Sequence, residues 1–167
     1  MKNNDLILNV ENFPKVNQKN DQNLFESFDI FSRLENICRE RNLFSLSACQ
    51  IGVPSSLFVF RRENKFDYFF DCDYVGIGQT IQSIEQCSSI FGDSGNYRTF
   101  EVSRFFEVDI SGKLLDICRE PNSSGLISKE VNFRESGRNA VIFQHEIDHC
   151  KNISISQIGK EINLFYD

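Results

Sequence analysis

Two stretches of the chain carry the residue pattern of helices. In residues 22–41 apolar positions recur at steps of three and four, which places one set of side chains on a single face: Leu24, Phe28, Phe31, Leu34 and Cys38. Residues 137–150 read as a second helix. Ser136 is its candidate N-cap, and Asn152 is a candidate left-handed residue just beyond its end.

Short apolar runs between the two helices predict strands. Residues 57–60 form one buried run, and residues 66–70 form another that charged residues bound. Residues 99–110 alternate as half-buried antiparallel strands do. Strands followed by a packed helix are typical of an α+β domain.

Glycine and proline positions indicate where those strands end. Gly76 and Gly78 predict one turn, and Ser111-Gly112 predict another, before a returning strand at residues 114–118. Residues 121–125, Pro-Asn-Ser-Ser-Gly, read as a loop. The turns therefore divide the middle of the chain into several short strands.

The composition is that of a globular domain. The chain has 167 residues, of which 40% are apolar, and this is enough to bury a core. It contains seventeen Phe and no Trp. We therefore expect a core built largely from phenylalanine rings.

Charge and cysteine usage exclude several classes of protein. The net charge of −6, with no Lys/Arg cluster beyond Arg61-Arg62, argues against binding to a nucleic-acid backbone. No apolar run is long enough to span a membrane, and the first residues lack the apolar segment of a secretory signal. We therefore expect a cytoplasmic protein whose six cysteines, with no Cys-x-x-Cys pair, are free thiols.

The segment His145-Glu146-Ile147-Asp148-His149 carries the clearest chemistry. Positions i and i+4 share one helix face, so the two imidazoles can bind one metal ion, with Glu146 close to a water ligand. This is the His-Glu-x-x-His pattern of zinc hydrolases. Two histidines on a solvated face are the alternative, but these are the only two in the chain, and both fall in this spacing.

A catalytic metal site usually has a third protein ligand and one open position. Cys87 stands out because polar residues flank it on both sides, whereas Cys38 and Cys118 lie in apolar runs. Local composition leaves two interpretations of Cys87 open, a metal ligand and a buried thiol.

Three segments, in this order, resemble the peptide deformylase family. Residues 43–50 resemble its Gly-apolar-Gly-apolar-Ala-Ala-x-Gln motif, and residues 85–89 resemble Glu-Gly-Cys-apolar-Ser. Residues 144–150 match Gln-His-Glu-x-Asp-His-Leu in all but the last position, where Cys150 stands. The third motif is the most specific of the three.

The resemblance implies a metal centre. Cys87, His145 and His149 would hold one divalent ion, with Fe(II) favoured and Zn(II) or Ni(II) as alternatives. Glu146 would be the general acid and base. The implied fold has antiparallel strands packed around a central metal-binding helix, with residues 1–167 as a single catalytic domain.

The resemblance also implies residues that contact the substrate. The Gln50 side-chain amide and the Ser88 backbone N–H would donate to the developing oxyanion. The backbone around Ser45 would hold the substrate in an extended pose, and Arg98 would lie near the peptide end of the cleft.

The implied reaction removes the formyl group from N-terminal formyl-methionine of nascent polypeptides and releases formate. The short stretch after the third motif fits a compact, bacteriophage-type enzyme. We expect a monomer in a bacterial or phage-infected cytosol, with a formyl-methionyl peptide as its partner and at most a transient contact with the ribosome.

Charged neighbours of the motifs are candidates to orient the metal ligands. Glu85 and Asp148 are such candidates, because a metal-bound histidine usually donates its other N–H to an oxygen. Pairing with Arg104 is the alternative for Glu85, and solvation at the surface is the alternative for Asp148. The long stretch between Arg104 and Gln144 predicts an enlarged hairpin.

Several residues depart from the family pattern. Leu43, Ser45 and Gln86 stand where the family has Gly, and Ser47 where it has Ala. These departures motivate an alternative, a metal-binding but catalytically weakened relative that acts as a binding module. A zinc endopeptidase with Glu161 as its downstream ligand is a third hypothesis.

Overall fold

The computed structural model describes residues 6–17, 19–92, 95–120 and 123–163, without the side chains of residues 118–124. Within these residues the helices and strands follow one another in this order: η1 (Val10–Asn12), α1 (Leu24–Arg41), β1 (Ser45–Ser47), η2 (Ala48–Ile51), β2 (Leu57–Arg62), β3 (Lys65–Phe91), β4 (Tyr97–Glu120), β5 (Ser123–Ser136), α2 (Gly137–Cys150), α3 (Ile155–Ile158) and β6 (Lys160–Ile162). The elements η1 and η2 are short 3₁₀ helices.

Helix α1 forms where the apolar spacing predicts it. Phe31, Leu34 and Cys38 are buried on one face, which packs against β2 and β1. The Asn23 side chain accepts the backbone N–H of Glu26 at 3.0 Å, and the Glu26 carboxylate accepts the N–H of Asn23 at 3.2 Å. This reciprocal capping box fixes the start of the helix.

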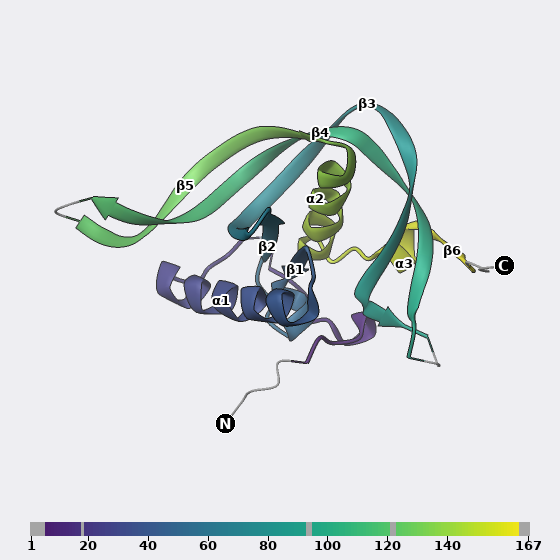
Figure 1. Cartoon of the computed structure of the whole chain (residues 1–167), viewed down its shortest axis with the longest axis horizontal. Coiled ribbons are helices and arrows are strands. Elements are labelled where there is room, and N and C mark those ends of the chain that lie inside the picture. Colours follow the sequence, from purple (N-terminus) through teal and green to yellow (C-terminus); the bar gives the residue numbers. More distant parts are fainter. Residues whose placement is uncertain (1–5, 18, 93–94, 121–122, 164–167) are drawn as a thin grey trace.

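The strands form one antiparallel sheet. Its order is β1-β2-β3-β4-β5, and β6 pairs with the first part of β4. Two strands are far longer than the rest, and they curve together into an arch over α2 (Figure 1). The antiparallel sheet with few helices confirms the α+β prediction.

Gly112 does not end a strand. It lies inside β4, so the predicted turn there and the separate returning strand are wrong. The β3–β4 register shifts between Phe70 and Asp73, opposite this glycine, and a Cβ at Gly112 would lie 2.4 Å from the sulfur of Cys72. Glycine therefore allows the bulged β3 to approach β4 closely at this bend.

Gly76 and Gly78 also lie inside β3, and the turn predicted from them is wrong. A Cβ at Gly76 would overlap the ring of Phe105 at 2.2 Å. Gly78 has φ of +69° where the β3–β4 register shifts a second time. The two glycines bend a continuous strand, which glycine permits as readily as it permits a turn.

Strands β4 and β5 form a long hairpin that extends from the body of the molecule (Figure 1). It lies where the sequence predicts an enlarged hairpin. Of the predicted loop at residues 121–125, residues 121 and 122 lie outside the described residues, and the other three belong to β5.

Helix α2 is buried on several sides, beneath the arch of long strands (Figure 1). The ring of Phe143 stacks on Phe60 at a centroid distance of 4.5 Å and meets three further rings edge-on: Phe58, Phe69 and Phe133. This cluster is the ring-built core that the composition predicts. Asn152, just beyond the helix, is left-handed as expected, with φ of +63°.

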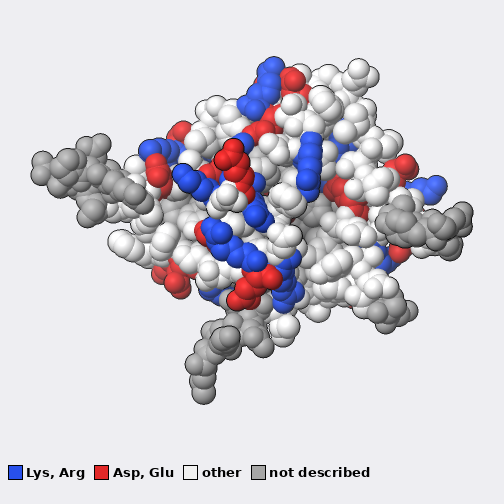
Figure 2. Space-filling view, viewed as in Figure 1, with Lys and Arg blue, Asp and Glu red and all other residues white. Residues whose placement is uncertain are grey.

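Charges of both signs lie side by side on the molecular surface. Figure 2 shows Lys and Arg side chains interspersed with Asp and Glu over the same face, so the net charge of −6 is not spread as a uniformly acidic surface. None of the described helices has the length and apolar character needed to cross a bilayer.

Candidate metal centre and substrate cleft

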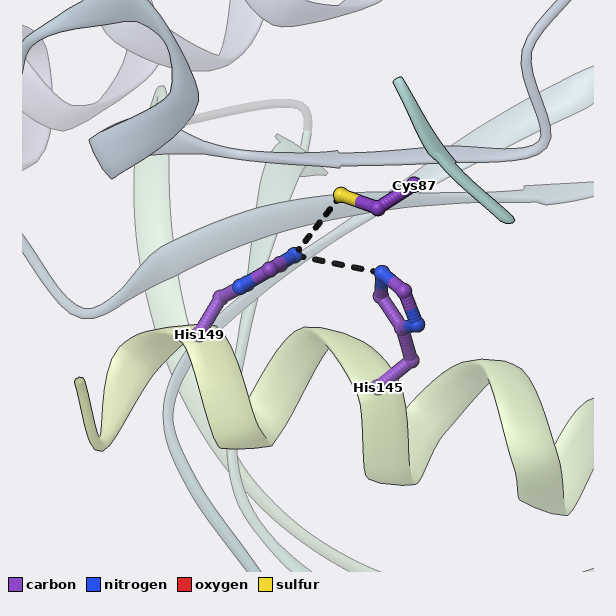
Figure 3. A group of neighbouring side chains, drawn as sticks. All are labelled: Cys87, His145 and His149. Atoms are coloured by element: carbon purple, nitrogen blue, oxygen red, sulfur yellow. Dashed lines mark hydrogen bonds between the residues drawn. The ribbon is translucent and has the colours of Figure 1, made fainter. Parts of the chain in front are cut away.

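Helix α2 brings the two histidines together. His145 and His149 lie one turn apart, and their rings point to the same side of the helix (Figure 3). Their Nε2 atoms are 3.1 Å apart. This arrangement follows directly from the i, i+4 spacing.

Cys87 reaches this pair from β3, as Figure 3 shows. Its sulfur lies 3.4 Å from His149 Nε2, and the three ligand atoms all lie within 4.8 Å of one another. Bond lengths of 2.0–2.3 Å at a tetrahedral angle place such ligand atoms roughly 3.3–3.6 Å apart. The three residues therefore fit a single metal ion, with a position left for water.

Buried charges surround the far side of His145. Its Nδ1 lies 2.9 Å from Glu85, whose carboxylate accepts two hydrogen bonds from Arg104 at 2.8 and 3.0 Å. Arg104 also pairs with Asp148, which accepts a hydrogen bond from the Tyr74 hydroxyl at 3.2 Å. Glu85 therefore contacts His145 and pairs with Arg104 at the same time. Asp148 is buried rather than solvated.

The local electrostatics favour a cation at the histidine pair. Burial lowers the pKa of His145, but hydrogen bonds to Cys87 and Glu85 outweigh it and raise that pKa well above its ordinary value. Burial and the neighbouring His145 hold the pKa of His149 well below its ordinary value, so this ring is neutral. Neutral imidazole is the form that ligates metals.

Glu146 is held by two serine hydroxyls. The hydroxyl of Ser45 donates to one carboxylate oxygen at 2.6 Å, and that of Ser47 donates to the other. The glutamate is buried, yet its side chain lines the cleft beside His145. The sequence predicted a role only for the backbone around Ser45 and none for Ser47, so the part played by the two hydroxyls is new.

Gln50 is fixed in a defined orientation. Its Oε1 accepts the backbone N–H of Ser47 at 2.8 Å, which turns Nε2 toward β3. Nε2 lies 3.0 Å from the Ser89 hydroxyl, 3.2 Å from the Ser88 hydroxyl and 3.7 Å from the sulfur of Cys87. The amide donor therefore points to the predicted metal ligand.

A cavity of about 580 Å³ opens at these residues. Its walls are β3 residues from Ile81 to Ser88, the segment around Ser45, and the exposed side of α2. The volume suits a small ligand or a short peptide segment. Metal-ligand candidates, an acid–base candidate and an amide donor thus share one cleft.

The comparisons with known proteins give the family of this chain. The model of the polypeptide deformylase family matches residues 7–161. The chain belongs to this family. Peptide deformylases are metal-dependent hydrolases, and a sequence search of curated proteins finds no match to this one.

Solved peptide deformylases share the fold. The enzyme from Synechococcus elongatus, in complex with actinonin, is 20% identical with a TM-score of 0.73, over 96% of this chain and 81% of that one. The enzyme from Thermotoga maritima is 19% identical with a TM-score of 0.68, over 89% and 90%. A probable peptide deformylase from Synechococcus phage S-SSM7 is 16% identical with a TM-score of 0.72, over 91% and 97%.

Two residues of this deformylase lie away from the cleft. Arg98, expected near the peptide end, is not among the residues that line the cavity. It forms a two-point ion pair with Glu161 on the exposed β6. Glu161, the ligand that the endopeptidase hypothesis needs, is thus engaged at this surface, and the ligand cluster found among the described residues contains Cys87 instead.

Residues from distant segments, which the sequence did not predict, pack around the candidate site. Ser89 holds Gln50, and Tyr74 holds Asp148. The ring of Phe13, from the N-terminal arm, meets His149 edge-on at 5.5 Å. These contacts join segments far apart in the sequence, so no local pattern predicts them.

Proposed function

We propose that this chain hydrolyses the formyl group from N-terminal formyl-methionine of nascent polypeptides and releases formate. One observation supports this most strongly: Cys87, His145 and His149 converge within 4.8 Å, with Glu146 beside them in an open cleft. Membership of the deformylase family gives the reaction class.

One thiolate and two imidazoles suit Fe(II), Zn(II) and Ni(II), and we propose Fe(II) as the working ion. A divalent ion at this position supplies Lewis-acid chemistry and activates a water molecule. The Glu85 carboxylate, held by Arg104, fixes the Nδ1 side of His145, so that its Nε2 would be free to hold the ion.

Glu146 moves the proton. Its carboxylate accepts a proton from water in the cleft and passes it to the departing amine. The hydroxyls of Ser45 and Ser47 fix the orientation of both carboxylate oxygens. The orientation of the base is therefore set before the substrate binds.

Gln50 and Ser88 bind the formyl oxygen as charge develops on it. The Gln50 amide is locked by the backbone of Ser47, and its Nε2 would exchange the contact with the Ser88 hydroxyl for one with the formyl oxygen. The β3–β4 register is interrupted between Gln86 and Phe91, which frees the backbone around Ser88 from regular strand pairing. Loss of one such donor typically raises the barrier by about 2.7–4 kcal/mol.

The substrate peptide lies along β1. Among the described residues β1 pairs only with β2, so its other edge, at Ser45, faces the cleft. An extended peptide can add to such an edge through backbone hydrogen bonds. Apolar cleft residues, Ile81, Ile84 and Phe106, offer contacts for the methionine side chain.

The experiment measures metal content and formate release together. Protein purified without oxygen is loaded with Fe(II) and given formyl-Met-Ala-Ser. Cys87→Ala should lose the metal and the activity, whereas Cys38→Ala, a control at a buried thiol in α1, should keep both. Glu146→Gln should keep the metal and lose turnover. Metal retained by Cys87→Ala would contradict the assignment and favour the endopeptidase hypothesis.

One observation favours a second candidate, a metal-binding relative with weakened catalysis. Both oxygens of Glu146 already accept hydrogen bonds from Ser45 and Ser47, which compete with a water for the carboxylate. Metal-loaded protein that binds formyl-Met-Ala-Ser but releases no formate would support this candidate.

A further inference from the structure

A second cavity adjoins the first. Its volume is about 820 Å³, and it shares three lining residues with the candidate active cleft: Phe44, Arg138 and Ile142. The remaining walls come from the end of β2, the β2–β3 turn and the start of β3. A peptide that leaves the first cavity past Phe44 therefore enters the second.

The charge of the second cavity is opposite to that of the whole molecule. Four cationic side chains line it, Arg61, Arg62, Lys65 and Arg138, against the carboxylates of Glu63 and Asp67. The chain as a whole has a net charge of −6. Charges of both signs are interspersed on the surface, so a local cationic site is compatible with that total (Figure 2).

Most of these cations lack a carboxylate partner among the described residues. Arg62 is neutralised by Asp67 at 2.8 Å and by Glu135 at 2.5 Å. Within the described ranges Arg61 donates to two neutral oxygens, the Glu63 carbonyl at 3.1 Å and the Asn42 side chain at 3.0 Å, and to no carboxylate. No ion pair of Lys65 or Arg138 is found in the part of the chain that the structure describes. The cavity therefore carries uncompensated positive charge.

Phe44 holds two of the guanidinium groups in place. The Arg138 guanidinium lies 4.2 Å from the centre of the Phe44 ring, and that of Arg61 lies 5.9 Å from it. Phe44 is 44% exposed and lines both cavities. Stacking of this kind restrains a guanidinium while its N–H edge stays available to a carboxylate.

We propose that this second cavity binds an acidic side chain of the formylated peptide, downstream of the methionine. The inference rests on the proposed function, because it needs a formyl-peptide in the first cavity. Phe44 directly precedes Ser45, along whose edge we place the substrate. The stacked Arg138 and the neighbouring Arg61 then meet the incoming carboxylate.

The test compares peptides that differ only in charge. Formyl-Met-Ala-Ser-Ala is the parent, and Asp or the isosteric Asn replaces its second, third or fourth residue in turn. At low salt we expect kcat/KM to be about five- to tenfold higher for Asp than for Asn at one position, mainly through KM. The preference should shrink as the salt concentration rises.

Two variants assign the preference to the cavity. Arg138→Gln should bring the Asp/Asn ratio close to one, and Arg61→Gln should reduce it. Lys160→Gln removes one positive charge from the exposed β6 and should leave both the ratio and the activity unchanged. Equal kcat/KM for Asp and Asn peptides at all three positions, or a preference that survives Arg138→Gln, would overturn the proposal.

Failure of the proposed function has a different signature. In that case no peptide, including the parent, releases formate. Fluorescence anisotropy with fluorescently labelled versions of the same peptides then measures binding to the cavity without turnover. Tighter binding of an Asp peptide than of its Asn counterpart, lost in Arg138→Gln, supports the acidic site, and equal binding refutes it.

Discussion

At the scale of single residues, the candidate acid–base group has an unusual environment. Glu146 is buried, and both of its carboxylate oxygens accept hydrogen bonds from serine hydroxyls. A hydrogen bond to a charged group contributes about 1.5–3 kcal/mol. Ser45 and Ser47 therefore restrain the carboxylate strongly, although neither would touch the metal.

We expect Ser47→Ala to lower kcat roughly tenfold, which corresponds to about 1.4 kcal/mol, because the Glu146 carboxylate loses one fixed contact. KM and metal content should stay close to those of the parent, since the ligand set is unchanged. Formate release and metal analysis on the same sample check this. A rise in kcat would instead show that the serine restrains Glu146 unproductively, and would favour the weakened relative.

At the scale of elements, glycines shape the two long strands. Gly112 and Gly76 each lie where a side chain or backbone of the partner strand approaches too closely for a Cβ. The bends let β3 pair with β2 at one end and carry Cys87 to α2 at the other. The metal centre thus depends on strand curvature as well as on the helix.

Gly112→Ala should destabilise the fold by about 1–3 kcal/mol, because the new methyl group would lie 2.4 Å from the sulfur and 2.9 Å from the Cα of Cys72. Gly125→Ala on β5 is the matched control, since its Cβ would meet no atom within 4 Å. Urea unfolding of the two variants measures the difference. Equal stability of both would contradict the close approach.

At the scale of the whole molecule, one buried charge network connects three elements. Glu85 from β3, Arg104 from β4 and Asp148 from α2 are all buried, and the Arg104 guanidinium donates hydrogen bonds to both carboxylates. Burial alone would raise the pKa of Glu85, but hydrogen bonds from His145 and Arg104 outweigh it and lower that pKa from 4.5 to about 2. The network therefore requires an ionised Glu85.

The lowered pKa of Glu85 makes the stability of the fold depend on pH. A pKa that folding lowers adds stability that is complete above pH 4.5 and is lost as the pH falls through about 2. In metal-free protein, Glu85→Gln should be less stable than the parent by about 3 kcal/mol near neutral pH. The difference should shrink toward pH 2, where about half of the folded parent carries a protonated Glu85. Urea unfolding at several pH values tests this, and a constant difference would contradict it.

Much of the candidate site could be predicted from local sequence. The i, i+4 spacing of His145 and His149 fixes their relation on any helix, and the apolar spacing fixes the buried face of α1. The deformylase motif gave Cys87 as the third ligand, which composition alone left open. The two helical predictions succeed because the geometry of a helix depends on neighbouring residues, whereas the ligand role of Cys87, on β3, stays a prediction.

The tertiary structure decided the rest. Gly76, Gly78 and Gly112 predicted turns but lie at bends in continuous strands. Glycine allows both a turn and a bend, and the pairing with the neighbouring strand selects the bend. The hydroxyls of Ser45 and Ser47 reach Glu146 across 101 and 99 positions of the sequence. Arg138 likewise stacks on Phe44 from a distant part of the chain. The sequence by itself determined the placement of the histidine pair and of Glu146 on one helix, because that relation depends only on short-range spacing. The neighbours of that chemistry depend on how curved strands pack on α2, which no local pattern encodes.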